Sequence, residues 1–189
     1  MKELAQLLLA AFAAVTVENL FFSRGMGFDR ILQSARRGRE IGTFSLLIGL
    51  FSLLSGLIAG PLNRILPDPR WWIPVSAGVT AVCCLAVSLV TACGFPALYR
   101  KIGWCLAPAT VNTVVLSIPI LTASRDWSPW QTAGFAIGTG FAFWCAAWLL
   151  AEMIPRFRHM SMPAAFRGMP AVFLYLAILV LAMMGFAQN

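Results

Sequence analysis

Long apolar stretches separated by short polar connections dominate the chain. A helix needs about 20 apolar residues to cross a bilayer core of roughly 30 Å, and its backbone groups then bond within the helix itself. Six stretches have suitable length and composition, at about Leu4–Phe22, Ile41–Ile58, Ile73–Cys93, Trp104–Leu121, Trp130–Ala151 and Met169–Ala187. The pattern predicts an all-α membrane protein with six transmembrane helices.

The composition agrees with this prediction. Of the 189 residues, 60% are hydrophobic and only 11% are charged, whereas about a quarter of the residues in soluble domains are charged. Nearly every residue falls in an apolar stretch or a short connection, so we expect one membrane domain over residues 1–189. The net charge of +7 lies between the apolar stretches, so we interpret it as a topology signal and an affinity for the lipid bilayer, and we expect no nucleic-acid binding.

The basic residues predict the orientation. The connections after the first, third and fifth stretches contain ten of the 14 Lys and Arg residues, and the opposite side contains four. Cytoplasmic loops are the ones enriched in Lys and Arg. We therefore expect a multi-pass protein of the bacterial cytoplasmic (inner) membrane with both termini outside the cytoplasm.

The two halves of the chain, about residues 1–95 and 96–189, start on opposite sides of the membrane in this topology. If they are related in structure, they form an inverted repeat of two three-helix units. The tripeptides Val17-Glu18-Asn19 and Val111-Asn112-Thr113 support this relation, because each places an amide in the middle of an apolar stretch. Corresponding polar interruptions of this kind indicate a central binding site.

Glu18 is the clearest candidate for a functional residue inside the membrane. A carboxylate at membrane depth costs a few kcal/mol unless it has a partner or water. One interpretation groups Glu18 with Asn19, Asn112 and Thr113 at the centre of the protein, lining an ion or electron route. The alternative is structural: Glu18 lies near the cytoplasmic interface and pairs with Arg24.

Other chemistry is not indicated. The sequence contains no phosphate-binding glycine loop, no Ser/His/Asp arrangement and no HExxH motif, so we expect no catalytic residues in this chain. His159 has no His or Cys nearby in the sequence, and we expect no metal site. The five cysteines form no CxxC pair and are interpreted as small apolar residues; they are Cys83, Cys84, Cys93, Cys105 and Cys145.

Three segments of the sequence resemble the Rnf/Nqr integral-membrane subunit family, and in particular its RnfA/NqrE branch. They are "VENLFFSRGMGFDR", "FPALYRKIGWCLAPATVNTVVL" and "MPAAFRGMPAVFLYLAILVLAMMGF". The Phe-Arg-Gly and Leu-Tyr-Arg segments are the most specific, and the resemblance covers essentially the whole chain.

The resemblance implies a fold and a cofactor. In this family the first and fourth helices are interrupted, and cysteines at the two interruptions of paired subunits bind a [2Fe–2S] cluster. The corresponding positions here are Asp29 and Thr113. Iron–sulfur clusters of this kind are held by cysteine thiolates. We therefore expect that this chain does not bind the family's [2Fe–2S] cluster through its own cysteines.

The resemblance also implies a function. The leading interpretation is a non-catalytic membrane subunit of a redox-driven, ion-translocating oxidoreductase of the Rnf/Nqr type. Its expected partners are other membrane subunits, or a pseudosymmetric paralogue, with Na⁺ or H⁺ as the transported ion. The alternatives are a stand-alone small cation transporter or channel, in which Glu18, Asp29 and the neighbouring polar residues bind the ion, and a structural membrane paralogue with no site.

Overall fold

The computed structural model describes residues 1–38, 40–66, 68–157, 163 and 166–187. Every regular element in these residues is helical, which confirms the all-α prediction. The elements are α1 (Lys2–Val15), α2 (Phe28–Arg37), α3 (Ile41–Ile65), the 3₁₀ turn η1 (Pro69–Trp71), α4 (Trp72–Gly94), α5 (Pro96–Thr110), α6 (Thr113–Ser124), α7 (Pro129–Arg156) and α8 (Met169–Ala187).

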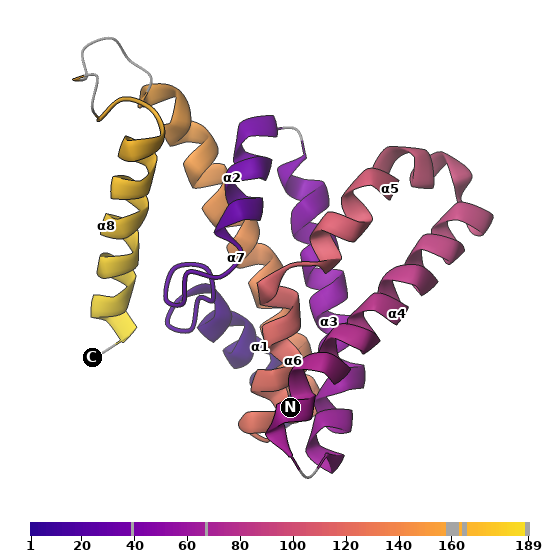
Figure 1. Cartoon of the computed structure of the whole chain (residues 1–189). Helices are drawn as coiled ribbons and strands as arrows, with labels where there is room; N and C mark the ends of the chain where they lie inside the picture. The colour runs from indigo at the N-terminus through magenta and orange to yellow at the C-terminus, as the bar shows by residue number, and fades with distance from the viewer. Residues whose placement is uncertain (39, 67, 158–162, 164–165, 188–189) are drawn as a thin grey trace.

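Helices α3, α6 and α7 form the centre of the molecule. Helix α3 packs against α6 and α7, while α1 and α2 pack on α7. Helices α4 and α5 meet at their ends and form an arm on one side, and α8 with the C-terminus stands on the other side (Figure 1). Large side chains fill the centre, and those that are fully buried include Phe21, Phe44, Phe51, Phe135 and Phe143.

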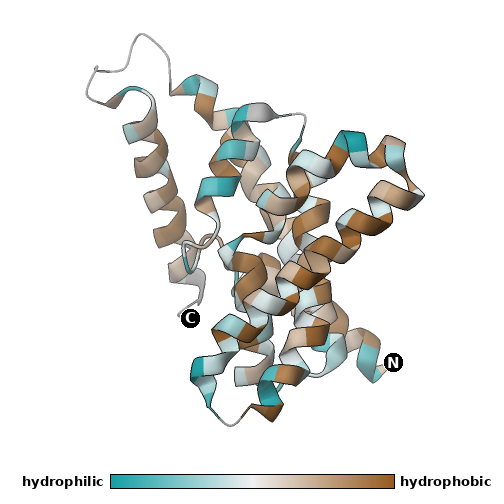
Figure 2. Cartoon of the chain, turned by 45° about the vertical axis from the view of Figure 1, so that its right-hand side comes forward, coloured by the Kyte–Doolittle hydropathy of each residue, from teal (hydrophilic) through white to brown (hydrophobic). Residues whose placement is uncertain are grey.

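The outside of the bundle is largely apolar. The hydrophobic colour runs along most of α4 and α8, and hydrophilic residues gather toward the ends of the longer helices (Figure 2). Helix α4 is the least buried of the long apolar helices, and Val82, Leu85 and Leu89 are about 65% exposed. Such surfaces need lipid or protein cover, as expected of a multi-pass membrane protein.

The count of membrane-crossing helices differs from the expected six. Among the described residues, α3, α7 and the stretch Pro69–Gly94 are long and apolar enough to cross a bilayer. Helices α5 and α6 have the length and composition of a span only when taken together, and the pair is bent by 54° at residues 111–112, as in a broken span or a re-entrant loop. The interruptions that the resemblance implies in the first and fourth helices are present, because α1 ends at Val15 after 14 residues and α5 ends at Thr110. The six-helix count stays a prediction.

Glycines bring α1 and α7 into close contact. A Cβ atom on Gly134 would lie 2.1 Å from the carbonyl oxygen of Leu7, and one on Gly138 would lie 2.4 Å from that of Ala11. No side chain fits at these distances. The two glycines therefore let α1 lie directly on the backbone of α7, as small residues do in membrane helix pairs.

Candidate functional site

The first break in the helical structure runs from Thr16 to Gly27 and is organised by Asn19. The side-chain Nδ2 of Asn19 donates to the carbonyl oxygen of Val15 at 3.0 Å, at the end of α1. Its Oδ1 accepts from the backbone N–H groups of Phe21 and Phe22 at 3.1 and 3.3 Å. Asn19 is only 3% exposed. Its amide therefore replaces backbone hydrogen bonds that are lost where the helix stops.

The second break lies between α5 and α6 and is organised in a similar way by Asn112. Its Oδ1 accepts from the backbone N–H of Val114 at 3.1 Å and caps the start of α6. Asn112 is 2% exposed, and its Nδ2 has no hydrogen-bond partner among the described residues. Asn19 and Asn112 thus both accept from the N–H two residues further along the chain.

The two breaks meet at Gly27. Its backbone N–H donates to the hydroxyl oxygen of Thr113 at 3.1 Å. A Cβ atom on Gly27 would lie 2.9 Å from Oδ1 of Asn112 and 3.1 Å from a methyl carbon of Val114, and its φ of +72° favours glycine. Gly27 therefore joins the end of the first break to the start of α6. The starts of α2 and α6 consequently lie close together.

The resemblance to the Rnf/Nqr family points to Asp29 and Thr113 at these two helix starts. Both residues are exposed at the surface of the chain. Asp29 lies in the first turn of α2, where its carboxylate pairs with Nε of Arg30 at 3.2 Å and is 71% exposed. Each helix start thus presents an oxygen atom that could act as a cation ligand. On α2 it belongs to a carboxylate, and on α6 it belongs to a hydroxyl.

Glu18 has a partner that sequence reasoning missed. Nη1 of Arg125 lies 2.5 Å from both carboxylate oxygens of Glu18, and the two side chains are 35% and 37% exposed. The expected partner was Arg24. Arg125 follows the end of α6, and its guanidinium carbon lies 5.5 Å from the ring centre of Trp127. In the sequence Arg125 is one of four basic residues predicted to lie outside the cytoplasm, and no pattern distinguishes it from the others as a partner of Glu18.

The structure therefore separates the four predicted central residues. Asn112 and Thr113 lie at the start of α6, whereas Glu18 bonds to Arg125 just after its end. The 12 residues of α6 span about 18 Å along the helix axis. Asn19 and Asn112 are both buried, but the hydrogen bonds of Asn19 stay within its own segment. The four residues therefore do not form a single cluster.

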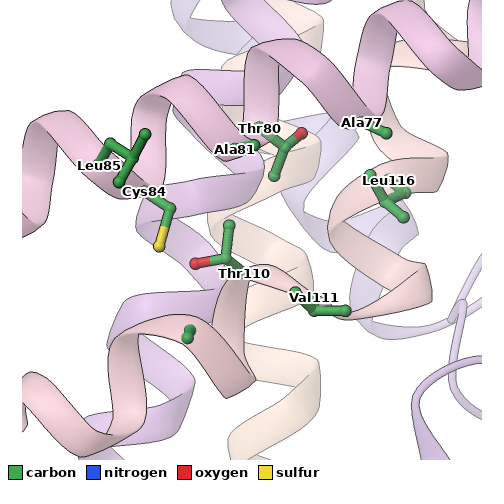
Figure 3. A pocket seen from close by; sticks show the side chains of 9 residues that line it. Ala77, Thr80, Ala81, Cys84, Leu85, Thr110, Val111 and Leu116 are labelled. Carbon is green, nitrogen blue, oxygen red and sulfur yellow. The ribbon is translucent and has the colours of Figure 1, made fainter.

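A groove of about 400 Å³ lies between α4 and the α5–α6 pair. Figure 3 shows Thr80 and Cys84 of α4 opposite Thr110 and Val111 at the second break. The two threonine hydroxyls donate to carbonyl oxygens of their own helices, Thr80 to Ser76 and Thr110 to Leu106, both at 2.6 Å. The groove is apolar, with no carboxylate among its lining residues, and it offers an ion no charged ligand.

Metal-binding side chains do not gather at either break. Within the described ranges, no three His, Cys, Asp or Glu side chains lie together in a way that suits a metal ion. The five cysteines are on α4, α5 and α7. His159 lies outside the described residues.

Comparisons with known proteins place this sequence in a family. A family model described as "Rnf-Nqr subunit, membrane protein" matches residues 7–188. The chain is 28% identical to the A subunit of an ion-translocating oxidoreductase complex from Syntrophotalea carbinolica over 185 residues, which is 96% of each chain.

Two further relatives match about half of their length. The A subunit of a proton-translocating ferredoxin:NAD(+) oxidoreductase complex from Clostridium ljungdahlii is 34% identical over 92 residues, 49% of this chain and 48% of that protein. The E subunit of a Na(+)-translocating NADH-quinone reductase from Methylococcus capsulatus is 27% identical over 110 residues, 58% and 54% of the two chains. Since the family model covers nearly the whole chain, the protein belongs to the Rnf-Nqr family of membrane subunits.

Proposed function

We propose that this protein is a membrane subunit of an ion-translocating electron-transport complex of the Rnf/Nqr type. The observation that carries the proposal is the match over nearly the full chain to the A subunit of an ion-translocating oxidoreductase complex. The buried amides at two helix breaks support it, because polar breaks in an otherwise apolar bundle are typical of proteins that move ions. The other subunits of such a complex are the expected partners.

The proposed architecture is an inverted repeat of two three-helix units. In this arrangement the broken helix α1–α2 corresponds to the broken helix α5–α6. Helix α3 then corresponds to α7, and α4 corresponds to α8, so that the broken helix comes first in each unit. The matching roles of Asn19 and Asn112 support it, since each amide accepts from the N–H two residues on. The distribution of Lys and Arg supports a place in the cytoplasmic membrane with both termini outside the cytoplasm.

The residues at the breaks do not fit the ligation of a [2Fe–2S] cluster. The two family positions carry a carboxylate, Asp29, and a hydroxyl, Thr113, whereas the irons of such clusters are held by thiolates. The cysteines lie on other helices. In the proposed function this chain contributes no cluster ligand, and partner subunits supply the redox centres of the complex.

A stand-alone cation transporter is the second candidate. The observation that favours it is the oxygen donor at each helix start, because carboxylate and hydroxyl oxygens suit hard cations such as Na⁺ better than thiolates do. In that case the chain alone moves ions. In the leading proposal, ion movement needs the complete complex and an electron donor.

Purification of the tagged full-length chain from its native membranes separates the two candidates. The leading proposal predicts co-purification of redox subunits in fixed stoichiometry and no ion flux from the chain reconstituted alone in lipid vesicles. A chain that purifies alone and moves Na⁺ or H⁺ by itself would replace the leading proposal with the second one.

A variant without cysteines tests the cofactor assignment. Replacement of all five cysteines by alanine should leave the iron and acid-labile sulfide content of the purified complex unchanged, because none of them is a cluster ligand in the proposal. The wild-type complex, purified in parallel, gives the reference content. Loss of about two irons per complex in the variant would show that a cysteine of this chain binds the cluster.

A further inference from the structure

A small cavity lies where α2, α7 and α8 come together at one end of the molecule. Its volume is about 110 Å³, and its lining residues are Arg36, Ile154, Gly168, Met169 and Val172. Helix α7 ends at Arg156 and α8 begins at Met169, on the same side of the molecule as the end of α2 (Figure 1). The cavity is therefore at the end of a membrane-spanning α7, where the surface of the bilayer is expected, and not at its middle.

Arg36 provides the charged wall of this cavity. It is in the last turn of α2 and is exposed. Its Nη2 contacts the sulfur of Met169 at 3.0 Å. A thioether sulfur is a weak acceptor, whereas a guanidinium carries five N–H donors. The contact thus occupies only a small part of the hydrogen-bonding capacity of Arg36, and the planar guanidinium suits the paired hydrogen bonds that a phosphate accepts.

The other walls are apolar and leave open space. A Cβ atom on Gly168 would have nothing within 4 Å, and Ile154 and Val172 contribute hydrocarbon side chains. The next residues of α8, Phe173 and Leu174, are more than half exposed. A ligand with a polar group and a hydrocarbon part can therefore use both kinds of wall, while a free phosphate ion can use only the charged one.

Positive charge is concentrated at this end of the chain. The connection of residues 23–40 contains five Arg residues and that of residues 155–168 contains three, and the acidic residues there and on the end of α7 are Asp29, Glu40 and Glu152. The start of α8 adds the positive end of a helix dipole. This is the side predicted to face the cytoplasm. Basic pockets between membrane helices on that side suit the phosphate head groups of anionic lipids.

We propose that the cavity between α2, α7 and α8 binds the phosphate group of an anionic phospholipid, with Arg36 as its charged ligand. The acyl chains of this lipid lie along the apolar surface of α8, beside Phe173 and Leu174. The lipid thus joins the amphipathic helix α2 to the last membrane helix. This inference does not rest on the proposed function, because it concerns only the charge and the shape of this cavity.

Native mass spectrometry of the purified full-length chain tests the proposal. The chain is titrated separately with phosphatidylglycerol and with phosphatidylcholine of the same acyl chains. Both lipids carry a phosphate, but the positive choline group makes the second one neutral overall, so the first phosphatidylglycerol should bind more tightly. Arg36→Gln should weaken phosphatidylglycerol binding about fivefold and leave phosphatidylcholine binding unchanged. Arg36→Lys keeps the charge without the paired donors and should give an intermediate loss.

Two further variants serve as controls. Arg100→Gln removes an exposed arginine of α5 on the same predicted side of the membrane and should leave the affinity for phosphatidylglycerol unchanged. Met169→Leu removes the sulfur but keeps the guanidinium, and it should also leave this affinity unchanged. Circular dichroism of each variant checks that its helices are retained.

Three results would overturn the inference. Equal weakening in Arg36→Gln and Arg100→Gln would show a general attraction to basic residues and no site. Weakening in Met169→Leu as large as in Arg36→Gln would assign the effect to the contact between α2 and α8. Displacement of the bound lipid by an equal concentration of inorganic phosphate would show that the cavity takes the free ion.

Discussion

Two asparagine side chains bond to the backbone where the helices of this protein break. Asn19 and Asn112 each accept a hydrogen bond from a backbone N–H that would otherwise be unpaired in a buried position. Both asparagines were predicted from the sequence, because each interrupts an apolar stretch. The sequence did not indicate their bonding partners, because a side-chain oxygen can accept from several nearby N–H groups and only the folded backbone decides which.

Loss of the Asn112 cap should destabilise the protein. Asn112→Ala removes the acceptor for the N–H of Val114 and should lower the free energy of unfolding by about 1 kcal/mol. Asn112→Ser keeps a capping oxygen and should recover most of that loss. Thermal unfolding of the purified protein in detergent measures both, and equal stability of the Ala and Ser variants would contradict the capping role.

The contact between the two breaks can be tested at Gly27. Gly27→Ala adds a Cβ atom 2.9 Å from the side chain of Asn112 at a φ of +72°, so strain and overpacking together should cost about 2–4 kcal/mol. Gly168 is the control, because it also has a positive φ, of +82°, but has nothing within 4 Å. Gly168→Ala should cost only the backbone strain, about 1–2 kcal/mol. An equal loss of unfolding free energy in the two variants would show that Gly27 is not in close contact with Asn112.

At the scale of elements, the apolar stretches indicated four helices well. The stretches beginning near Ile41, Ile73, Trp130 and Met169 correspond to α3, α4, α7 and α8. The first stretch is interrupted, as the resemblance implies. Hydropathy alone does not mark the position of the break, because it measures how apolar residues are and not where backbone hydrogen bonds go. The connection that follows it contains the short helix α2, with Ile31 and Ser34 buried.

The packing of α1 on α7 depends on glycine. Gly138→Ala would place a Cβ atom 2.4 Å from the carbonyl oxygen of Ala11, and moving α1 away should cost about 1–3 kcal/mol. Gly78→Ala on α4 is the control, since nothing lies within 4 Å of that position, and it should be neutral or slightly stabilising. A normal thermal midpoint for Gly138→Ala would contradict direct contact between the two backbones.

At the scale of the whole molecule, the sequence predicted a membrane protein from its few charges, and the family relation agrees. The separation of Glu18 from Asn112 was not predictable. Both residues interrupt apolar stretches at similar depth, but the fold turns Glu18 toward Arg125, which is 107 positions away in the sequence. Pairings over such distances depend on how the two halves pack.

The distribution of basic residues predicts the orientation in the membrane, and labelling measures it directly. In a cysteine-free background, Arg70→Cys, between α3 and α4, should react with a membrane-impermeant maleimide added to intact spheroplasts. Arg100→Cys, near the start of α5, should react only after the membrane is opened. Both residues are exposed. The reverse labelling pattern would invert the topology and place both termini in the cytoplasm.

The most direct test of the proposed function is donor-driven ion accumulation in inverted membrane vesicles. Vesicles from a strain with the intact gene, from a strain with the gene deleted and from a complemented strain are given NADH or reduced ferredoxin, and internal Na⁺ and pH are followed. The account predicts accumulation of one of the two ions in the first and third preparations and none in the second. Accumulation at the same rate without this chain would contradict it.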